Sequence, residues 1–592
     1  MKANENNFGF MEQESLIEIP FFQRAYVWEE EQWEQLLEDL RDSYANKREH
    51  FLGSVVLKQL STSAGEGTKR SLIDGQQRLT TFSILVKSLY DKLESDDKVD
   101  YANYLFKKPT KEKSPKIQHS KIDRISFNEI LQAKDFASLQ DIERYKEGKH
   151  KGKIKDKLIR CYEYFTEQIN KEKSYKDFLN FILNSKLWVT INLDTNEDEQ
   201  KIFDSINTAG LKLTATDIIK NALFAKAMEL NSDYERLYQE YWECLFETKE
   251  NKEFWEEEVS TGRLKRVQSE IFLHAFAIIG GFFDVEKDTL ENLSDIYKTQ
   301  IKNFDTKKLE SFLKKIKEYA LIYQNFPHIT KETPLCFVND EQRLFHILNI
   351  TDTNTIMPLI LALKLKLKNK DDALKDCLKL LEIFILTRWL CSESTKEYNK
   401  MFANITRKLD INKPLEFLRD NLKDIPKKYK IEDCLMSKDD YLENKKAALI
   451  LFWIELYRRY INKEKQDSIE LSYKWTLEHL MPESWEENWR KIAKDELHAE
   501  DLIYQIGNMT LLKGSLNSSI KNASWKIKLE GDGTRKNCIK NCADLLITRE
   551  ILDKKIWNED NIRERTQKLM QDFFKIWDIE ALQNKNQKES QW

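Results

Sequence analysis

The chain has 592 residues and a formal net charge of −4, from 96 lysines and arginines against 100 aspartates and glutamates. This balance excludes a globally basic nucleic-acid-binding surface, so any such surface must be a local patch. Only 15 glycines and 9 prolines are present, which disfavours all-β architectures and predicts a predominantly helical α+β protein of several domains. The polar start, the lack of a long apolar run and the scattered cysteines predict a cytoplasmic protein that does not enter the membrane.

The stretch 71–90, SLIDGQQRLTTFSILVKSLY, predicts a short strand, a turn and a helix. The turn falls at Asp74 and Gly75, and apolar residues then recur three and four positions apart, which indicates a buried helical face. Free backbone N–H groups at such a junction suit an anion such as phosphate, and Arg78 adds a forked donor for it. Taken alone, an ordinary capped turn is an equally good interpretation of this stretch.

A second Gln-Arg pair precedes a second predicted helix. Residues 17–40 indicate a short strand followed by a helix with an acidic first turn. Gln23 and Arg24 stand before this helix, as the pair at 77–78 stands before the other one. Because arginine is rarely buried unless it is paired, packing alone does not explain two such pairs.

A third polar cluster follows the predicted strand WVTINLD at 188–194. Gly210 marks a turn, and Thr216 with Asp217 is typical of a helix N-cap. This segment carries more polar side chains than a plain helix–turn–helix needs. The side chains concerned are Asn207, Asp217, Lys220 and Asn221.

Much of the remaining sequence carries no interpretable chemistry. Lysine-rich runs at 107–125 and 145–157 are typical of solvated loops, with a local phosphate-contacting surface as the alternative. From about 230 to 470 the sequence predicts one helix after another, without a fixed repeat. We expect this part to be a scaffold.

The last informative block, 472–530, concentrates polar residues around two short apolar segments. Glu478 and His479 end the first apolar run, Asn508 opens the predicted strand MTLL, and Asn517 lies nine positions later. A lone histidine on an apolar segment is usually a core residue. This one is flanked by a polar constellation, so we predict a chemical role for it.

Together these segments resemble the GmrSD-type modification-dependent (type IV) restriction endonucleases. IPFFQRAYVW, IDGQQRLTTF and FDSINTAGLKLTATDIIKNALF are similar, in order, to the GmrS-like domain, and LEHLMP, IGNMTLL and LN to the GmrD-like nuclease half. The resemblance implies a single-chain fusion of three parts. These are a ParB/sulfiredoxin-type domain at 1–230, a helical scaffold at 231–440, and a divergent His-Asn-His (ββα-metal) nuclease domain embedded in helices at 441–592.

In this family the N-terminal domain senses modified DNA and binds, and often hydrolyses, nucleoside triphosphates. One departure from the family pattern is Asp204, where a glutamate is common, and it leaves the charge unchanged. The resemblance implies a nucleotide site in two parts. The first is built from Gln23, Arg24, Asp74, Gln76, Gln77 and Arg78, and the second, which closes the same pocket, from Asn207, Asp217, Lys220 and Asn221.

The nuclease half suggests a definite chemistry. Phosphodiester hydrolysis needs a base to activate water and a cation to neutralise the charge that develops on the phosphate. His479 is the predicted general base, since imidazole titrates near neutral pH. Glu478 and Asn517 offer hard oxygen ligands, which predicts Mg²⁺ or Mn²⁺ as the cofactor. Asn508 is expected to tie the loop down and to orient the imidazole.

Two details of this site stay open. Adjacent residues on a regular strand point to opposite faces, so Glu478 and His479 share a site only if the strand ends or twists there, as Pro482 would allow. The second metal ligand is Asn517 by its spacing of nine from the preceding asparagine, with Asn522 as the alternative.

These features favour a DNA endonuclease or nickase of antiphage defence that cuts double-stranded, modified phage DNA and responds to a nucleoside triphosphate. A homodimer is expected, because one His-Asn-His site cuts one strand at a time. The alternative is a nucleotide-hydrolysing or DNA-binding regulatory protein whose C-terminal domain does not cut. All four nuclease residues are present, which favours the enzyme, since a degraded domain is expected to have lost at least one.

Overall fold

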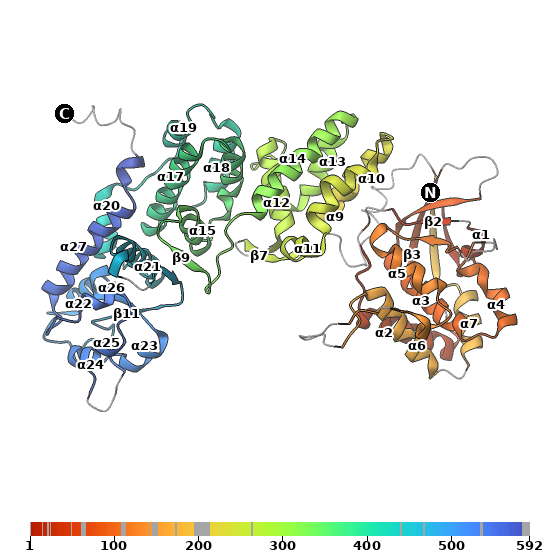
Figure 1. Ribbon diagram of the computed structural model, residues 1–592, viewed down its shortest axis with the longest axis horizontal. Coiled ribbons are helices and arrows are strands. Elements are labelled where there is room, and N and C mark those ends of the chain that lie inside the picture. Colours follow the sequence, from red (N-terminus) through yellow and green to blue (C-terminus); the bar gives the residue numbers. More distant parts are fainter. Residues whose placement is uncertain are drawn as a thin grey trace. The chain divides into compact units, whose positions relative to one another are not determined.

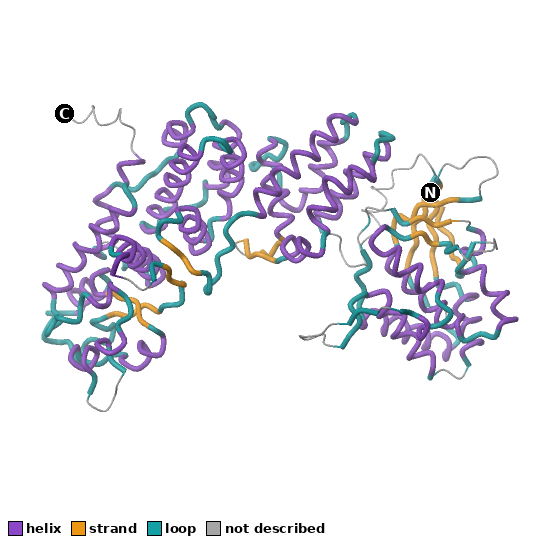
Figure 2. The backbone as a smooth tube through the Cα atoms, viewed as in Figure 1, coloured by secondary structure: helices purple, strands orange, loops and turns teal. Residues whose placement is uncertain are grey.

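A computed structural model of the chain falls into two units, Met1–Lys226 and Ala227–Trp592 (Figure 1). Helices predominate and a mixed sheet lies in the first unit (Figure 2), which confirms a helix-rich α+β protein. Among the helices of the described residues, none combines the length and the apolar content needed to cross a membrane. The described residues are 2–14, 16–20, 23, 25–48, 50–60, 67–107, 114–140, 142–144, 152–171, 174–194, 214–261, 264–438, 441–465, 468–532 and 537–582.

The first unit is built on a six-stranded mixed sheet in the order β1-β6-β3-β4-β2-β5. β6 runs antiparallel to β1 and parallel to β3, β3 pairs antiparallel with β4, and β2 runs parallel to both β4 and β5. Val55, Leu57 and Leu72 belong to the core beneath the helices. The strands are β1 (Lys2–Asn6), β2 (Leu16–Glu18), β3 (Gly53–Gln59), β4 (Lys69–Asp74), β5 (Ile117–Gln118) and β6 (Trp188–Leu193).

Helix α3 (Gln76–Asp91) forms the centre of this core. The apolar face expected from the sequence is buried. The remaining side chains from Leu79 to Tyr90 are buried as well, because β3, α5, α6 and α7 surround the helix. Its hydroxyl groups are accommodated since Ser83 and Ser88 donate to carbonyls one turn earlier. The other helices are α1 (Phe10–Gln13), α2 (Glu30–Asn46), α4 (Ser95–Tyr101), α5 (Lys121–Gln132), α6 (Lys157–Asn170) and α7 (Tyr175–Asn184).

From residue 215 onward the chain is helical, as predicted for residues 230–470, and four short strands are inserted. β7 (Glu258–Thr261) pairs with β8 (Leu264–Val267), and β9 (Pro334–Cys336) pairs with the later β10 (Glu470–Ser472). Residues Gln239–Glu247 form a π-helix. The α-helices are α9 (Ala215–Glu229), α10 (Tyr234–Tyr238), α11 (Lys249–Glu256), α12 (Gln268–Gly280), α13 (Leu293–Ile301), α14 (Thr306–Gln324), α15 (Asp340–Thr351), α16 (Met357–Lys366), α17 (Asp371–Leu390), α18 (Tyr398–Lys408), α19 (Pro414–Asn421) and α20 (Lys428–Met436).

The C-terminal part is arranged around an antiparallel hairpin of β11 (Thr476–His479) and β12 (Met509–Leu512). All four residues of β12 are buried, because α21 and α26 pack against the strand, while α27 packs against the turn η7 (Ile506–Asn508) that precedes it. The helices are α21 (Asn444–Ile461), α22 (Glu496–Ile503), α23 (Gly514–Ile520), α24 (Trp525–Glu530), α25 (Ile539–Cys542), α26 (Leu546–Arg549) and α27 (Glu559–Ile576).

A buried ionic contact joins the middle helices to the end of the second unit. Arg343 on α15 is fully buried, and its Nε donates to Oε1 of Glu382 on α17 at 2.7 Å. The indole Nε1 of Trp577, just after α27, donates to the same oxygen at 2.6 Å. Residues that lie far apart in the sequence therefore share one core.

Candidate active site and candidate nucleotide site

His479 ends β11, and several elements hold its imidazole ring. Its Nδ1 lies 3.1 Å from the backbone carbonyl of Ile503, at the end of α22, and its Nε2 lies 2.9 Å from the side-chain amide oxygen of Asn444, at the start of α21. The side chain is only 11% exposed, and Tyr504 packs edge-on against the ring. Burial lowers the pKa of His479 from its ordinary value, so the neutral ring that can accept a proton predominates at neutral pH.

Each nitrogen of this ring faces an oxygen. The Ile503 carbonyl lies at Nδ1 and Oδ1 of Asn444 lies at Nε2, and a neutral ring can donate to only one of them. When Nδ1 donates to the carbonyl, which can only accept, the lone pair is on Nε2, and the Asn444 amide must rotate to turn its NH₂ group to it. In that tautomer His479 is a base whose lone pair is covered by Asn444.

Asn508 reaches the same carbonyl from another side. The residue is fully buried, and its Nδ2 donates to the carbonyls of Ile503 and Met481 at 3.0 and 2.8 Å. Its Oδ1 accepts from the Met481 N–H at 2.8 Å and from the Trp557 indole at 3.0 Å, so the amide makes all four of its hydrogen bonds. Because Asn508 and His479 share the Ile503 carbonyl, Asn508 positions the group that orients the imidazole.

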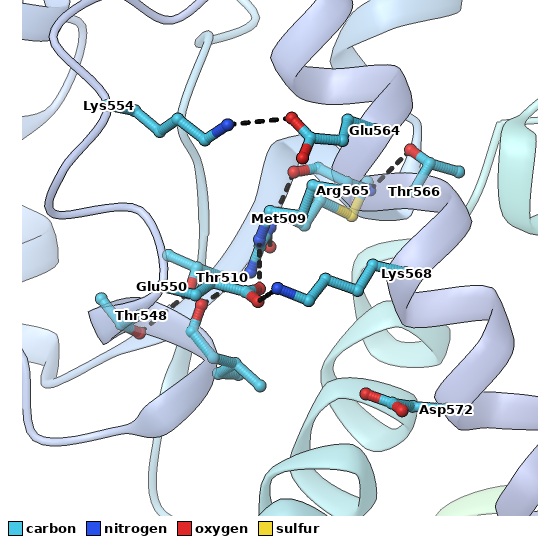
Figure 3. A network of polar contacts seen from close by, with 12 residues as sticks. Met509, Thr510, Thr548, Glu550, Lys554, Glu564, Arg565, Thr566, Lys568 and Asp572 are labelled. Atoms are coloured by element: carbon cyan, nitrogen blue, oxygen red, sulfur yellow. Dashed lines mark hydrogen bonds and ion pairs between the residues drawn. The ribbon is translucent and has the colours of Figure 1, made fainter.

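Arg565 of α27 binds the backbone of the turn that carries Asn508 (Figure 3). The Arg565 guanidinium donates to the carbonyls of Gly507 and Met509 at 2.7 and 2.6 Å, and its Nε donates to Glu550 at 2.8 Å. Arg565 is 5% exposed, so these charge-assisted bonds form away from water and are strong. They fix the backbone on both sides of Asn508.

Gly507 is required by the close approach of α27 to the same turn. A Cβ at this position would lie 2.2 Å from the Ile562 carbonyl oxygen and 2.3 Å from the Thr566 hydroxyl oxygen. The Gly507 N–H donates to that hydroxyl at 3.2 Å. Only a residue without a side chain lets the helix come this near, so the glycine serves helix packing here.

The Glu478 side chain lies on the face of the hairpin opposite to that of His479. Its carboxylate accepts from Nζ of Lys528 on α24 at 2.5 Å, and the same ammonium donates to the His479 carbonyl at 2.8 Å. Burial raises the pKa of Glu478 and lowers that of Lys528, while their mutual attraction opposes both changes. The strand keeps a regular register through His479, so the two adjacent side chains do not meet in this structure.

The predicted metal ligands do not form a cation site as they are arranged. Asn517, on α23, donates its Nδ2 to the Leu477 carbonyl at 2.6 Å, and Glu478 is neutralised by Lys528. The alternative ligand Asn522 lies beyond α23, where its backbone carbonyl accepts a hydrogen bond. Within the described ranges, no cluster of three or more His, Cys, Asp or Glu side chains could hold a metal ion. Mg²⁺ or Mn²⁺ fits here only once Lys528 has released the carboxylate.

In the first unit, Gly75 makes the turn between β4 and α3 in the left-handed region, at φ 97°. Arg78 donates to Oδ2 of Asp74 at 3.1 Å and to the Ser54 carbonyl at 3.0 Å. Its guanidinium also lies against Gly53, where a Cβ would be 2.5 Å from Nη1. The predicted phosphate donor is thus paired within the protein, and a phosphate has to compete with Asp74 for it.

Gln23 and Gln77 tie two segments of the chain together beside this turn. Nε2 of Gln23 donates to the Leu72 carbonyl at 2.7 Å, and Oε1 of Gln77 accepts from the Val27 N–H at 2.9 Å. Gln76 is buried at the start of α3. The expectation that packing does not explain the Gln-Arg pairs is wrong for the glutamines, because each bonds to backbone of the segment that carries the other.

The third predicted segment is described only from residue 214 onward. On α9, the Asp217 carboxylate accepts from the Thr214 hydroxyl at 3.0 Å and lies 3.8 Å from Nζ of Lys220. Asn221 follows on the same helix. That these residues close a pocket at the β4–α3 turn stays a prediction. Two predicted site residues lie outside the described part of the chain, namely Arg24 and Asn207.

Comparison with known protein families finds a match at each end of the chain. Residues 6–224 match the N-terminal domain of the GmrSD restriction endonucleases, and residues 425–572 match their C-terminal domain. The chain belongs to the GmrSD restriction endonuclease family. This membership gives it a restriction-nuclease role with DNA as the substrate. A search of curated proteins finds no match.

The two GmrSD matches enclose the two candidate sites. The N-terminal match contains the β4–α3 turn, and the C-terminal match contains Asn444, His479 and Asn508. Residues 225–424, which lie between the matches, hold most of the middle helices. The resemblance to GmrSD proteins expected from the sequence motifs is confirmed.

The sequence motifs did not single out several residues that shape this candidate site of the GmrSD chain. Asn444 lies before the 472–530 block, and Lys528 lies in it as one lysine among several. Ile503 acts through its backbone carbonyl, which leaves no signal in the side-chain pattern. The one available signal was Gly507, a glycine directly before Asn508 in a chain with few glycines.

Proposed function

We propose that this chain is a DNA endonuclease or nickase of antiphage defence, of the modification-dependent (type IV) kind, with His479 as its general base. The observation that carries the proposal is the Ile503 carbonyl, which Nδ1 of His479 faces at 3.1 Å and to which Asn508 donates, and this supports Nε2 as the basic nitrogen. The order β11, β12, α23 supports a divergent His-Asn-His (ββα-metal) domain, and the mixed sheet of the first unit supports a ParB/sulfiredoxin-like domain.

The proposed reaction is hydrolysis of a phosphodiester bond. Nε2 of His479 takes a proton from a water molecule, and the oxygen of that water attacks phosphorus. The bond from phosphorus to the leaving sugar oxygen breaks, and this oxygen takes up a proton from solvent. The lowered pKa of His479 keeps the base deprotonated at neutral pH. Asn444 must move off Nε2 for the water to enter.

The cation requirement of the proposal rests on the oxygens of Glu478 and Asn517, which suit Mg²⁺ or Mn²⁺. Lys528 donates to the Glu478 carboxylate at 2.5 Å. A divalent cation and an ammonium cannot both occupy that carboxylate oxygen at bonding distance. We therefore expect cation binding at Glu478 and its pairing with Lys528 to exclude each other.

A Lys528→Met variant is expected to lose about 3 kcal/mol of unfolding free energy, because Glu478 stays buried without its partner. The double variant Glu478→Gln/Lys528→Met buries no charge and should recover most of this loss. If Glu478 can ligate a metal, millimolar Mg²⁺ should raise the melting temperature of Lys528→Met and leave that of the double variant unchanged. Thermal denaturation with and without Mg²⁺ measures both melting temperatures. If Mg²⁺ shifted them equally in the two variants, Glu478 would not be a metal ligand.

The first unit is the proposed sensor of modified DNA and of a nucleoside triphosphate. It hydrolyses the nucleotide only after a phosphate has displaced Asp74 from Arg78. The backbone N–H groups after Gly75 and the adjacent guanidinium support this assignment. Binding there would shift the population between idle and cutting states. A homodimer would bring two cutting sites to the two DNA strands.

A regulatory protein that binds DNA or hydrolyses nucleotide without cutting is the second candidate function. Two contacts favour it, since Asn444 covers the His479 lone pair and Lys528 occupies Glu478. Both contacts would keep the C-terminal site idle. They are equally consistent with a nuclease at rest, which needs such restraint to spare the host chromosome.

Cleavage of plasmid and phage DNA by the full chain tests the proposal. The DNA panel comprises unmodified, glucosylated and phosphorothioate forms, each with Mg²⁺ or Mn²⁺ and with or without nucleoside triphosphates. Supercoiled plasmid separates a nick from a double-strand break. Cleavage confined to a modified form is the expected result. Hydrolysis of nucleotide with no cleavage of any DNA would favour the regulatory function over the nuclease.

Replacing Asn444 with alanine is expected to speed cleavage about 2- to 10-fold, because freeing Nε2 of His479 removes one hydrogen bond worth about 0.5–1.5 kcal/mol. The control is Asn462→Ala at the other end of α21, whose side chain donates to the Arg458 carbonyl of its own helix. Initial rates at saturating DNA measure both variants. Slower cleavage in Asn444→Ala alone would instead make Asn444 a residue that positions the base.

A further inference from the structure

Two cysteine side chains meet where the middle helices join the C-terminal part of the chain. Cys391 directly follows α17 and Cys434 lies in α20, and their Sγ atoms are 3.4 Å apart. The two residues are 43 positions apart in the sequence, so the fold brings them together. A disulfide has an Sγ–Sγ distance of about 2.0 Å, so the two sulfurs have to approach each other by about 1.4 Å.

Both cysteines lie near helix ends, where the backbone can take up such a shift. Cys391 is the first residue after α17, and Ser392, which follows it, has a left-handed φ of 53°. Cys434 lies two positions before Met436, the last residue of α20. Because helix ends fray more readily than helix interiors, we expect the bond to close without unfolding of either helix.

The two thiols differ in exposure and in charge. Cys391 is 9% exposed, while Cys434 is only half-buried. The contact with Cys434, and then burial, raise the pKa of the Cys391 thiol, so this sulfur keeps its proton. Lys430 lies one turn before Cys434 on α20, binds Glu393 at 2.7 Å and interacts with both sulfurs. Its positive charge favours a thiolate at Cys434, which makes Cys434 the sulfur that an oxidant attacks first.

We propose that Cys391 and Cys434 are a redox-sensitive pair, which closes to an intramolecular disulfide when hydrogen peroxide reaches Cys434. The Cys434 thiolate attacks one oxygen of the peroxide and the O–O bond breaks. The other oxygen leaves as hydroxide and takes up the proton that Cys434 had released, which gives water and a sulfenic acid at Cys434. The Cys391 sulfur then attacks the Cys434 sulfur, the S–O bond breaks, and the departing hydroxide takes the Cys391 proton to form a second water. The two sulfurs lose two electrons in total, and the peroxide gains them.

The disulfide would join the C-terminal GmrSD domain to the helices that precede it. Cys434 lies inside the matched range 425–572, and Cys391 lies before it. Ser392, next to Cys391, accepts from Nζ of Lys446 on α21 at 2.6 Å. The link therefore acts on the junction at which α21 begins. In a reducing compartment such a bond is transient, which suits a sensor of oxidants rather than a permanent cross-link.

Peptide mapping of the full chain after peroxide treatment tests the proposal. Trypsin releases residues 389–396 and 431–438 as separate peptides with one cysteine each. We expect one linked peptide, lighter by two hydrogens than the sum of the two, which dithiothreitol separates. Cys434→Ser, which replaces the half-buried thiol, should abolish the link, and Cys391→Ser should do the same. Cys244→Ser is the matched control, because Cys244 is exposed in the same unit, and it should leave the link unchanged.

The melting temperature shows whether the link forms within the native fold. A cross-link restricts the unfolded chain, so the linked protein should melt about 2–5 °C higher than the same protein after treatment with dithiothreitol. Dithiothreitol cleaves the disulfide and leaves methionine sulfoxide as it is, so the comparison isolates the effect of the link. Peroxide-treated Cys434→Ser should melt at the same temperature with and without dithiothreitol.

Three outcomes would overturn the proposal. The first is the absence of a linked peptide at a peroxide dose that oxidises the exposed Cys244. The second is a link from Cys434 to a cysteine other than Cys391, and the third is a linked protein that melts no higher than its reduced form. The measurements need no DNA, nucleotide or divalent cation, so failure of the nuclease proposal would leave their result intact.

Discussion

A Gly507→Ala variant is expected to lose about 4–5 kcal/mol of unfolding free energy, and with it the nuclease activity. The added Cβ would lie 2.2 Å from the Ile562 carbonyl oxygen and 2.3 Å from the Thr566 hydroxyl oxygen. Neither atom can yield easily, because both belong to α27, which Arg565 binds to the same turn. Urea denaturation followed by circular dichroism measures the loss.

Gly514→Ala is the matched control for this substitution. Gly514 begins α23 in the same part of the fold, and a Cβ there would meet only Cγ2 of Thr476, at an ordinary 3.7 Å. We expect a change within about 0.5 kcal/mol, or a slight stabilisation from the reduced freedom of the unfolded chain. If both variants were equally stable, α27 would not be held rigidly against the Asn508 turn, and the role given to Arg565 would fail.

A His479→Ala variant is expected to cleave DNA about 10²- to 10⁴-fold more slowly than the wild type, because water is no longer activated by a positioned base. Its stability should change little. The Ile503 carbonyl, which loses its bond from Nδ1, keeps the bond from Asn508 at 3.0 Å and is not left without a partner. Single-turnover cleavage of the preferred DNA form, together with thermal denaturation, separates the two effects.

His328→Ala controls for the loss of a histidine as such. His328 lies in the same unit, and its side chain is 60% exposed. It should leave both cleavage and stability unchanged. Cleavage that persists at the wild-type rate in His479→Ala would show that the base lies elsewhere in the chain. Loss of cleavage in both variants would point to contamination or to a general effect on folding.

The sequence predicted the elements around the candidate nuclease site better than the contacts within it. The MTLL strand, the apolar run that ends at Glu478 and His479, and the place of Asn508 directly before the strand were readable, because short apolar runs and their polar ends leave a local pattern. The Ile503 carbonyl was not readable, since every residue has one. Lys528 meets Glu478 across 50 positions of sequence, and no local pattern encodes such a pairing.

In the first unit, too, the elements were predictable from the sequence and the contacts were not. The turn at Gly75 and the helix after it follow from glycine chemistry and apolar spacing, and both are present. That α3 is buried on all sides could not be predicted, because its serines look like solvent-facing residues until their bonds to the helix backbone are known. For the same reason Gln23 and Gln77 suggested ligand chemistry, although the structure uses them to join two stretches of backbone.

Trp577 and Arg343 both bond to Glu382. We therefore expect that the C-terminal part of the chain, from α21 onward, does not fold correctly when it is fused to another protein without α15 and α17. A fragment that begins after α20 would lose Glu382 and leave the Trp577 indole without its acceptor. Recombination between relatives should therefore preserve α15, α17 and the C-terminal helix as one inherited block. Within such a block, a change at Glu382 would select for compensating changes at Arg343 and Trp577.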